Sequence, residues 1–252
     1  MTADLERRGH AVLDLPSRDY KAMKMARLLG LDPAGPRKRL LEIGCGSGGI
    51  SHWFGEAGPM GWDVDAVDVE DVRLVREGYR FRTVTGTTLP FDDASFDVVL
   101  TNHVIEHVGD EEAQRAHLRE VRRVLRNDGV AYLAVPCRWM LVEPHFKLPF
   151  LSWLPMPLSH AYVRLAGKGT HYDCLPLTCG RLEPMLADAG FAWRQRTGDA
   201  LRLTFELERP DAPLYRHGLR HVPDAMYAVA RRAFPTLIYT LRPLATPSEP
   251  AR

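Results

Sequence analysis

Leu40-Leu41-Glu42-Ile43-Gly44-Cys45-Gly46-Ser47-Gly48-Gly49 decides the fold of this 252-residue chain. An apolar run that ends in an acid and opens into a glycine-rich turn is typical of the first strand and turn of an α/β domain. The glycines let the backbone bend sharply and approach a ligand without a Cβ atom in the way. We expect a helix to begin near Ser47, so that its N-terminal amides face a nucleotide-like cofactor.

The glycine turn alone is compatible with two kinds of cofactor. Gly44, Gly46 and Gly49 also satisfy the G-x-G-x-x-G pattern of dinucleotide-binding turns. Asp68 ends the next apolar run, at the distance where a carboxylate can accept hydrogen bonds from both ribose hydroxyls of either cofactor. A tight turn without any ligand is the remaining alternative.

Three further motifs follow in order along the chain. They are Leu89-Pro90-Phe91, Phe96-Asp97-Val98-Val99 and Glu106-His107-Val108. Together with the glycine turn, this order closely resembles that of the class I S-adenosylmethionine-dependent methyltransferases, which include quinone and sterol methyltransferases. The resemblance is strong over residues 38–136 and looser elsewhere. It implies a Rossmann-like α/β fold, with a doubly wound, mostly parallel seven-stranded sheet and helices on both faces.

The resemblance also implies which residues hold S-adenosylmethionine. Gly44, Gly46 and Gly48 would wrap the methionine and ribose parts of the cofactor. Glu42 would orient that loop and the methionine amino group, and Asp68 would hold the ribose diol.

The adenine side of the cofactor site follows from the same resemblance. Thr87 and Leu89 would flank the adenine, and Asn102 would close the pocket from the fourth strand. The family usually has Asp where this chain has Thr87, so we expect the contact to the adenine amino group to be weaker or to involve a backbone carbonyl.

Periodicity and capping residues predict the remaining elements. Strands are expected at 39–43, 64–68, 81–84, 96–101, 130–135, 191–197 and 236–241, and helices at 17–29, 110–126, 178–189 and 222–234. Ser17 and Asp110 are predicted to cap helix N-termini, and Gly30 and Gly129 to end helices. Pro136 should end the fifth strand, because proline cannot continue a central ladder. The resemblance implies that the last strand is antiparallel.

We expect a single methyltransferase domain over residues 1–252. Its parts are an N-terminal helical lid (1–37), a cofactor-binding core (38–136), a substrate-side insertion (137–177), the C-terminal half of the fold (178–245) and a flexible tail (246–252). The insertion is rich in proline and aromatic residues and should roof the active site. We expect it to be a hydrophobic lid, and the alternative is a peripheral membrane-surface contact through 146–158, with Phe150, Leu151, Trp153 and Leu154 exposed.

Composition indicates a cytoplasmic protein with a small-molecule substrate. The net charge is +1, which gives no overall electrostatic reason to expect a nucleic-acid partner. The charged first residues do not form a signal peptide, and no apolar run is long enough to span a membrane. The cysteines at 45, 137, 174 and 179 contain no C-x-x-C pair, so they predict reduced thiols rather than disulfides or a zinc site.

Methyl transfer needs little chemistry from the protein, because the sulfonium already activates the methyl group. A hydroxyl acceptor also needs a base, for which histidine is the first candidate. His145, with Glu143 beside it to orient the ring, is our predicted base, and His103 is the competing one. His171 is a further candidate, whereas the resemblance gives His107 a structural role.

A metal site from His145, Glu143, His171 and Asp173 is conceivable, but its spacing is unspecific and no metal is predicted. The function that we predict is O-methylation of a small-molecule or lipid-linked acceptor, with N- or C-methylation of a natural product or quinone as the alternative. A dinucleotide-binding oxidoreductase is the alternative from a different class. The oligomeric state is not predicted.

Overall fold

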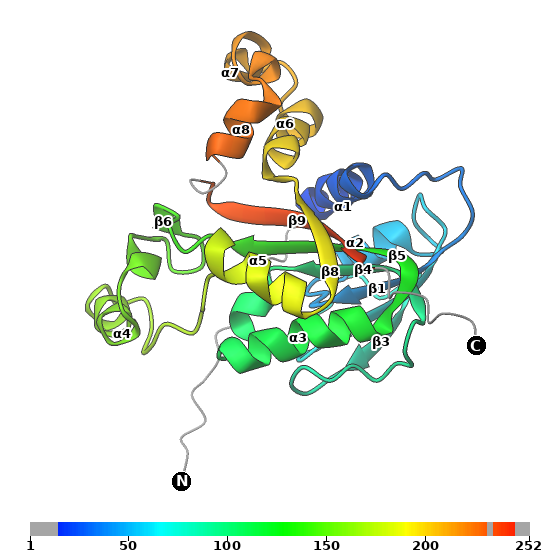
Figure 1. Ribbon diagram of the computed structural model, residues 1–252, viewed down its shortest axis with the longest axis horizontal. Helices are drawn as coiled ribbons and strands as arrows, with labels where there is room; N and C mark the ends of the chain where they lie inside the picture. Colours follow the sequence, from blue (N-terminus) through cyan, green and yellow to red (C-terminus); the bar gives the residue numbers. More distant parts are fainter. Residues whose placement is uncertain (1–14, 231–233, 245–252) are drawn as a thin grey trace, which may run out of the picture.

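The computed structural model describes residues 15–230 and 234–244, which contain a seven-stranded sheet (Figure 1). Its strands are β1 (Arg39–Ile43), β2 (Asp63–Asp68), β3 (Arg80–Thr83), β4 (Phe96–Asn102), β5 (Leu125–Pro136), β8 (Phe191–Gln195) and β9 (Thr236–Pro243). The strand order is β3-β2-β1-β4-β5-β9-β8, and β9 pairs antiparallel with both of its neighbours. The predicted mostly parallel seven-stranded sheet with an antiparallel last strand is therefore confirmed.

Helices cover both faces of this sheet, as predicted (Figure 1). They are α1 (Pro16–Leu29), α2 (Gly49–Phe54), α3 (Glu111–Val124), α5 (Cys179–Asp188) and α6 (Thr197–Glu208), followed by α7 (Pro213–His217), the short helix η3 (Leu219–His221) and α8 (Asp224–Ala230). A short helix η1 (Ile105–His107) follows β4. The connections on either side of β3, residues 69–79 and 84–95, contain no helix, so strands and helices do not alternate strictly.

Alternate side chains of the central strands point to opposite faces and form two cores. On one face, Leu41, Ile43, Val99 and Leu133 pack with Leu118 and Val121 of α3 and with Leu182 and Leu186 of α5. On the other face, Leu40, Val64, Val98 and Leu100 pack with Met25 of α1, Ile50 and Phe54 of α2, and Ala200 of α6. The parallel strands are thus buried on both sides, as their apolar sequences predict.

The insertion after β5 forms a small separate unit at one side of the sheet (Figure 1). It contains a short hairpin of β6 (Val142–Glu143) and β7 (Leu148–Pro149), then a short helix η2 (Leu151–Trp153) and α4 (Met156–Leu165). Its own apolar core includes Phe146, Leu151 and Tyr172. Leu151 is completely buried there, so the membrane-contact alternative was wrong to count it among the exposed residues, although Phe150 and Trp153 are exposed.

Two predicted helix ends differ from the structure. Gly129 does not end a helix, because α3 stops at Val124 and the chain passes directly into β5. The polar sequence of residues 126–128 resembles a loop, but Leu125 already pairs with Phe96 across a register shift. Ser17 does not cap α1, whose N-cap is Leu15 without a side-chain bond. Asp110 does cap α3, since its side chain accepts a hydrogen bond from the Ala113 amide.

The C-terminal half contains more helix than predicted. Thr197 belongs to α6 and not to the sixth strand, which ends at Gln195. The helix predicted at 222–234 is observed as α8, and residues 231–233 lie outside the described chain. The predicted tail at 246–252 and the first part of the predicted N-terminal lid also lie outside it.

Helix α1 is fastened to the C-terminal half of the chain. The Lys24 ammonium donates to the Thr204 hydroxyl (2.8 Å), and the Arg27 guanidinium pairs with Glu206 (2.7 Å). The Arg196 guanidinium also donates to the carbonyl of Leu28 at the end of α1 (3.0 Å). Residues at the two ends of the sequence thus build one side of the domain together.

A buried histidine gives the fold a predictable dependence on pH. His117 of α3 lies 3.0 Å from the Thr101 hydroxyl, and burial lowers the pKa of His117 from 6.5 to about 4. Between these pH values the unfolded chain binds a proton that the folded chain does not, so the free energy of unfolding should fall as the pH falls from 6.5 to 4. His117→Gln cannot titrate and should flatten this part of the profile, measured by urea unfolding. An unchanged profile in the variant would contradict the assignment.

Candidate active site

The glycine turn between β1 and α2 has the conformation that glycine alone adopts easily. Gly44, Gly46 and Gly48 have φ angles of 75°, 50° and 80°. A Cβ atom on Gly44 would collide with the Val104 side chain, and one on Gly48 would collide with the Val75 carbonyl. These positions therefore need glycine both for the turn and for the close approach of neighbouring chain.

Asp68, at the end of β2, holds this turn in place. Its carboxylate accepts hydrogen bonds from the Gly46 amide (2.8 Å) and from the Val69 amide (2.7 Å). The Gly44 amide in turn donates to the Val67 carbonyl (2.8 Å). The carboxylate is partly exposed and lies at the carboxyl end of the sheet, where ligands of such sheets bind.

Glu42 is buried beneath the turn. The Ser51 hydroxyl of α2 donates to its carboxylate, and burial raises the pKa of Glu42 to about 8, although the Arg18 charge opposes this. A cationic amino group beside Glu42 would favour its ionised form. This environment is suited to the methionine amino group that the sequence assigns to Glu42.

Helix α1 brings two cations to Glu42 that sequence reasoning missed. Arg18 is 9% exposed and packs on the glycine turn, with its Cβ atom 2.8 Å from where a Cβ on Gly49 would lie. Burial and the charge of Arg18 lower the pKa of Lys21 to about 8. The sequence signal that could have revealed this contact is the presence of two basic residues, Arg18 and Lys21, close together on the predicted lid helix.

The three residues predicted to surround the adenine differ in their burial and contacts. Leu89 is buried, and its amide donates to the Glu120 carboxylate (2.8 Å). Thr87 is half-buried, next to a turn at Gly86, and Asn102 is the last residue of β4. Their contacts with adenine stay predictions.

A group of polar side chains, which we call the polar cluster, gathers beyond β4 and β5. It consists of His103, Glu106, His107, Glu143, His145 and Cys174. The group reaches the cofactor loop through Val104, whose side chain touches Gly44.

Glu143 and His145 form the pair that the sequence predicts. The His145 ring donates from Nδ1 to Glu143 Oε1 (2.8 Å), and the Phe146 amide donates to the second carboxylate oxygen (2.7 Å). Burial lowers the pKa of His145, but the hydrogen bond and charge of Glu143 outweigh this and raise it overall. Glu143 is only 1% exposed, and these two hydrogen bonds hold its carboxylate in one orientation.

Glu106 organises the second half of the polar cluster. It is fully buried, its Oε1 atom lies 3.2 Å from His103 Nδ1, and the same oxygen lies 3.9 Å from His107 Nε2. Burial raises the pKa of Glu106, but the hydrogen bond and charge of His103, with that of His107, outweigh this and lower it overall. His103 has a φ angle of 59°, a left-handed conformation that costs a residue with a Cβ atom about 1–2 kcal/mol.

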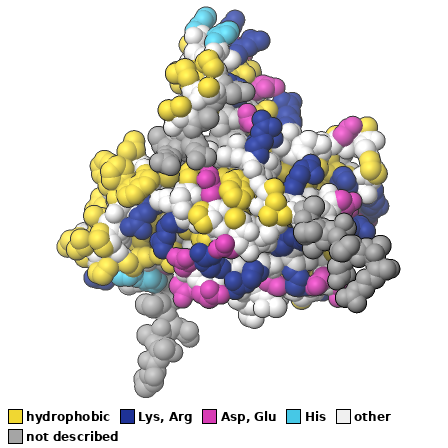
Figure 2. Space-filling model, viewed as in Figure 1, with side chains coloured by type: hydrophobic (Ala, Val, Ile, Leu, Met, Phe, Trp, Pro, Cys, Tyr) yellow, Lys and Arg dark blue, Asp and Glu magenta, His cyan; other side chains and the backbone are white. Residues whose placement is uncertain are grey.

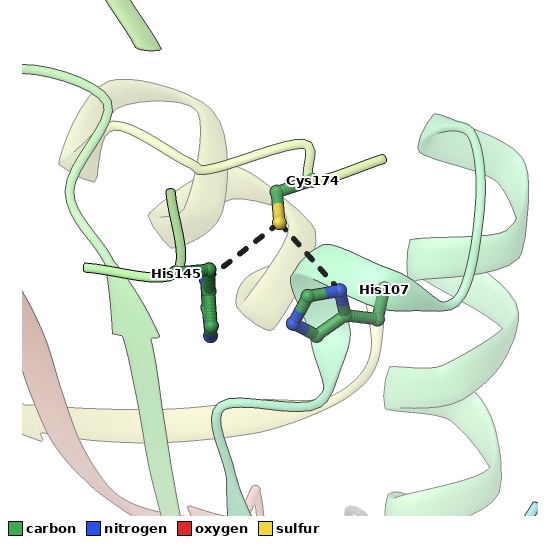
Figure 3. Close-up of side chains that lie close together, drawn as sticks. All are labelled: His107, His145 and Cys174. Atoms are coloured by element: carbon green, nitrogen blue, oxygen red, sulfur yellow. Dashed lines mark hydrogen bonds between the residues drawn. The ribbon is translucent and has the colours of Figure 1, made fainter. Parts of the chain in front are cut away.

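Cys174 joins the two halves (Figure 3). Its sulfur lies 3.7 Å from His107 Nδ1 and 3.8 Å from His145 Nδ1, and the two rings are 5.2 Å apart between centroids. Burial and the nearby carboxylates raise the pKa of the Cys174 thiol. His171, in contrast, faces His160 of α4, so it does not join His145 as the metal alternative required.

Two buried polar atoms, one in the polar cluster and one on a neighbouring residue, have no hydrogen-bond partner among the described residues. They are Glu106 Oε2 and the Tyr172 hydroxyl, which belong to residues that are 0% and 4% exposed. Buried polar atoms are normally paired in folded proteins, so these two mark a place that a ligand or solvent would fill.

Comparison with known proteins identifies the family. A methyltransferase domain matches residues 41–133. A ubiquinone biosynthesis O-methyltransferase of Sinorhizobium fredii is 34% identical over 192 residues, which are 71% of this chain and 71% of that protein. The chain belongs to the class I S-adenosylmethionine-dependent methyltransferases. Its cofactor is S-adenosylmethionine, which removes the dinucleotide alternative that the glycine turn left open.

A second relative and a solved structure also resemble this methyltransferase. A protein of the same name from Parvibaculum lavamentivorans is 29% identical over 169 residues, which are 64% of this chain and 61% of that protein. The second is a putative methyltransferase whose structure was solved in complex with the Haloferax volcanii Trm112 methyltransferase activator. It matches with a TM-score of 0.54 and 18% sequence identity, over 92% of this chain and 94% of that methyltransferase. This second similarity concerns the fold alone.

Removal of the Asp68 carboxylate should weaken cofactor binding. Asp68→Ala removes the bond to the Gly46 amide and the carboxylate that is predicted to accept charge-assisted hydrogen bonds from the ribose. We expect a loss of about 1.5–3 kcal/mol, or roughly 10- to 150-fold in the Kd for S-adenosylhomocysteine, measured by calorimetry. Asp68→Asn keeps one acceptor oxygen and should lose less. An unchanged Kd in Asp68→Ala would rule out the assigned role.

Proposed function

We propose that this methyltransferase transfers the methyl group of S-adenosylmethionine to an oxygen atom of a small-molecule or lipid-linked acceptor. The observation that supports the proposal is the carboxylate–histidine pair of Glu143 and His145 in the polar cluster, on the segment that follows β5. The names of two relatives, which describe O-methyltransferases of ubiquinone biosynthesis, favour oxygen over nitrogen or carbon as the acceptor atom.

The proposed reaction is an in-line displacement. The acceptor oxygen attacks the methyl carbon, the carbon–sulfur bond breaks, and S-adenosylhomocysteine leaves. Correct placement of the two reactants supplies most of the acceleration, up to about 7–11 kcal/mol in favourable cases. Because Glu143 accepts a hydrogen bond from Nδ1 of His145, the other ring nitrogen, Nε2, is the atom that takes the acceptor's proton.

An assay with simple aromatic acceptors tests the reaction class. The purified protein would be incubated with labelled S-adenosylmethionine and with catechol, aniline and indole as hydroxyl, amine and carbon acceptors. We expect methylated catechol, identified by mass spectrometry, with smaller amounts of the other products. N-methyl or C-methyl product alone would contradict O-methylation.

We also propose that the insertion contacts a lipid surface, which would bring it to a lipid-linked acceptor. Exposed apolar side chains gather on this part of the molecule (Figure 2). They are Trp139, Leu141, Val142, Phe150, Trp153, Leu158 and Leu165. Exposed basic side chains at 147, 164 and 168 lie on the same insertion. Apolar and cationic groups together favour an anionic membrane surface.

Sedimentation with lipid vesicles tests this contact. The protein should sediment with vesicles that contain phosphatidylglycerol and less with neutral phosphatidylcholine vesicles. Leu141→Ser combined with Phe150→Ser removes two exposed apolar groups and should reduce the bound fraction. Leu214→Ser, an exposed leucine on α7, is the matched control. Equal binding by both variants would contradict the proposal.

The remaining observations concern the described helices, the cysteines and the net charge. No described helix has the length and hydropathy needed to cross a bilayer. The four cysteines are thiols and form no disulfide, which supports the predicted cytoplasmic location. The net charge of +1 supports a small-molecule acceptor over a nucleic acid.

A further inference from the structure

We infer that His107, His145 and Cys174 form a binding site for a soft divalent cation, with Zn²⁺ as the best match. One ligand atom from each residue lies within 4.8 Å of the other two. The three side chains come from η1, from the segment after β6 and from the end of the insertion, and they turn toward a common point (Figure 3). One thiolate and two imidazoles are ligands that zinc prefers.

The distances in this group are close to those around a bound zinc ion. Bond lengths of about 2.3 Å to sulfur and 2.0–2.1 Å to nitrogen, at a tetrahedral angle, separate the two ligand atoms by about 3.6 Å. The Cys174 sulfur lies 3.7 Å from His107 Nδ1 and 3.8 Å from His145 Nδ1. Small side-chain movements would therefore complete a three-ligand site with an open fourth position.

The surroundings also favour a cation. Glu143 and Glu106 are buried carboxylates that contact the two histidines, at 2.8 Å from His145 Nδ1 and 3.9 Å from His107 Nε2. Asp173 adds a third carboxylate beside the Cys174 sulfur (3.7 Å). Glu106 faces Nε2 of His107, the ring nitrogen that would not bind the metal, which is the usual place of a carboxylate partner of a metal site. The hydrogen bond from Nδ1 of His145 to Glu143, in contrast, would give way to the metal.

The cation would switch off the base, a consequence that rests on the proposed function. Zinc bound at Nδ1 of His145 displaces the proton that this nitrogen donates to Glu143, and the thiol of Cys174 releases its proton to solvent. After exchange with solvent, the neutral, metal-bound ring carries its single proton on Nε2 instead. That nitrogen can no longer accept the acceptor's proton, so zinc should inhibit methyl transfer.

Metal binding can be measured without any acceptor. The protein would be stripped with a chelator, dialysed and titrated with Zn²⁺ by calorimetry, and Co²⁺ would be added in parallel. We expect one Zn²⁺ per chain and a cobalt–thiolate absorption band. Cys174→Ser should weaken zinc binding by about 100-fold or more and remove the band, since even changes to partners of metal ligands cost roughly 10- to 100-fold.

Cys179→Ser is the matched control, because Cys179 is also buried but lies on α5, beside Gln195. It should bind Zn²⁺ and Co²⁺ as the unchanged protein does. Unchanged affinity for S-adenosylhomocysteine would show that both variants are folded. Zinc binding that survives Cys174→Ser, or no binding by the unchanged protein, would overturn the site.

Turnover in the presence of zinc tests the switch. Stoichiometric Zn²⁺ should reduce the methylation rate about tenfold or more, and chelator should restore it. The Cys174→Ser variant should lose this sensitivity. A rate that rises with zinc would overturn the inhibitory role. Failure of the proposed function would appear differently, as an inactive stripped protein that still binds zinc at Cys174.

Discussion

Gly48→Ala should reduce the affinity for S-adenosylhomocysteine by roughly 5-fold or more, because overpacking costs about 1–3 kcal/mol and forces the glycine turn to move; the left-handed backbone adds about 1–2 kcal/mol to the loss of stability. The new Cβ atom would collide with the Val75 carbonyl and the Tyr79 hydroxyl, and φ at this position is 80°. The Val75 amide is itself bonded to the Ser47 carbonyl (3.1 Å), so it cannot move without disturbing the turn. Calorimetry measures the affinity.

Gly61→Ala is the control for this prediction. Gly61 has a φ of 62°, but nothing lies within 4 Å of its added Cβ atom. This variant should therefore lose about 1–2 kcal/mol of stability from the backbone alone. Its affinity for S-adenosylhomocysteine should not change. Equal affinities in the two variants would show that the collision at Gly48 does not shape the cofactor site.

His145→Ala should lower the turnover rate of the zinc-free enzyme by ~10²-fold or more, the usual contribution of a general base. Cofactor affinity should be nearly unchanged, because His145 contacts Glu143 and Cys174, neither of which is predicted to bind the cofactor. Glu143→Gln should have a smaller effect, since it keeps an acceptor for Nδ1 but removes the charge that supports a protonated ring. Single-turnover measurements with an excess of catechol separate the chemical step from cofactor binding.

His103→Ala is the necessary comparison, because His103 is also paired with a buried carboxylate, that of Glu106. It should keep most of the turnover rate. If His145→Ala is fully active and His103→Ala is not, the base is misassigned. If both are fully active, the acceptor is already acidic or nucleophilic and needs no histidine.

The sheet and the cofactor loop could be predicted because their determinants are local. The glycine turn, Asp68 and the apolar strands each lie within a few consecutive residues, so their conformations follow from backbone sterics and periodicity. The Glu143–His145 pair was also predictable, since only one residue separates the two. The same local reasoning was wrong at Gly129, where pairing of Leu125 with Phe96 outweighs a loop-like sequence.

The missed parts of the site depend on contacts between distant segments. Cys174 meets His107 across 67 positions of sequence, and Arg18 reaches Glu42 from a separate helix. The Leu175 amide fixes the first of these contacts by bonding to the Glu106 carbonyl (2.8 Å). No spacing rule indicates such a meeting, because it depends on how the insertion folds back over η1.

The fastening of α1 to α6 has a consequence for biosynthesis. A chain grows from its N-terminus, and domains begin to fold while synthesis continues. The hydrogen bonds of Lys24 and of the Leu28 carbonyl need Thr204 and Arg196. The strands β1 to β4 can therefore pair on the ribosome before α1 has its final partners. The bonds from α1 to α6 form only after residue 204 has been translated, whereas the packing of Arg18 on the glycine turn needs only α2 and is possible earlier.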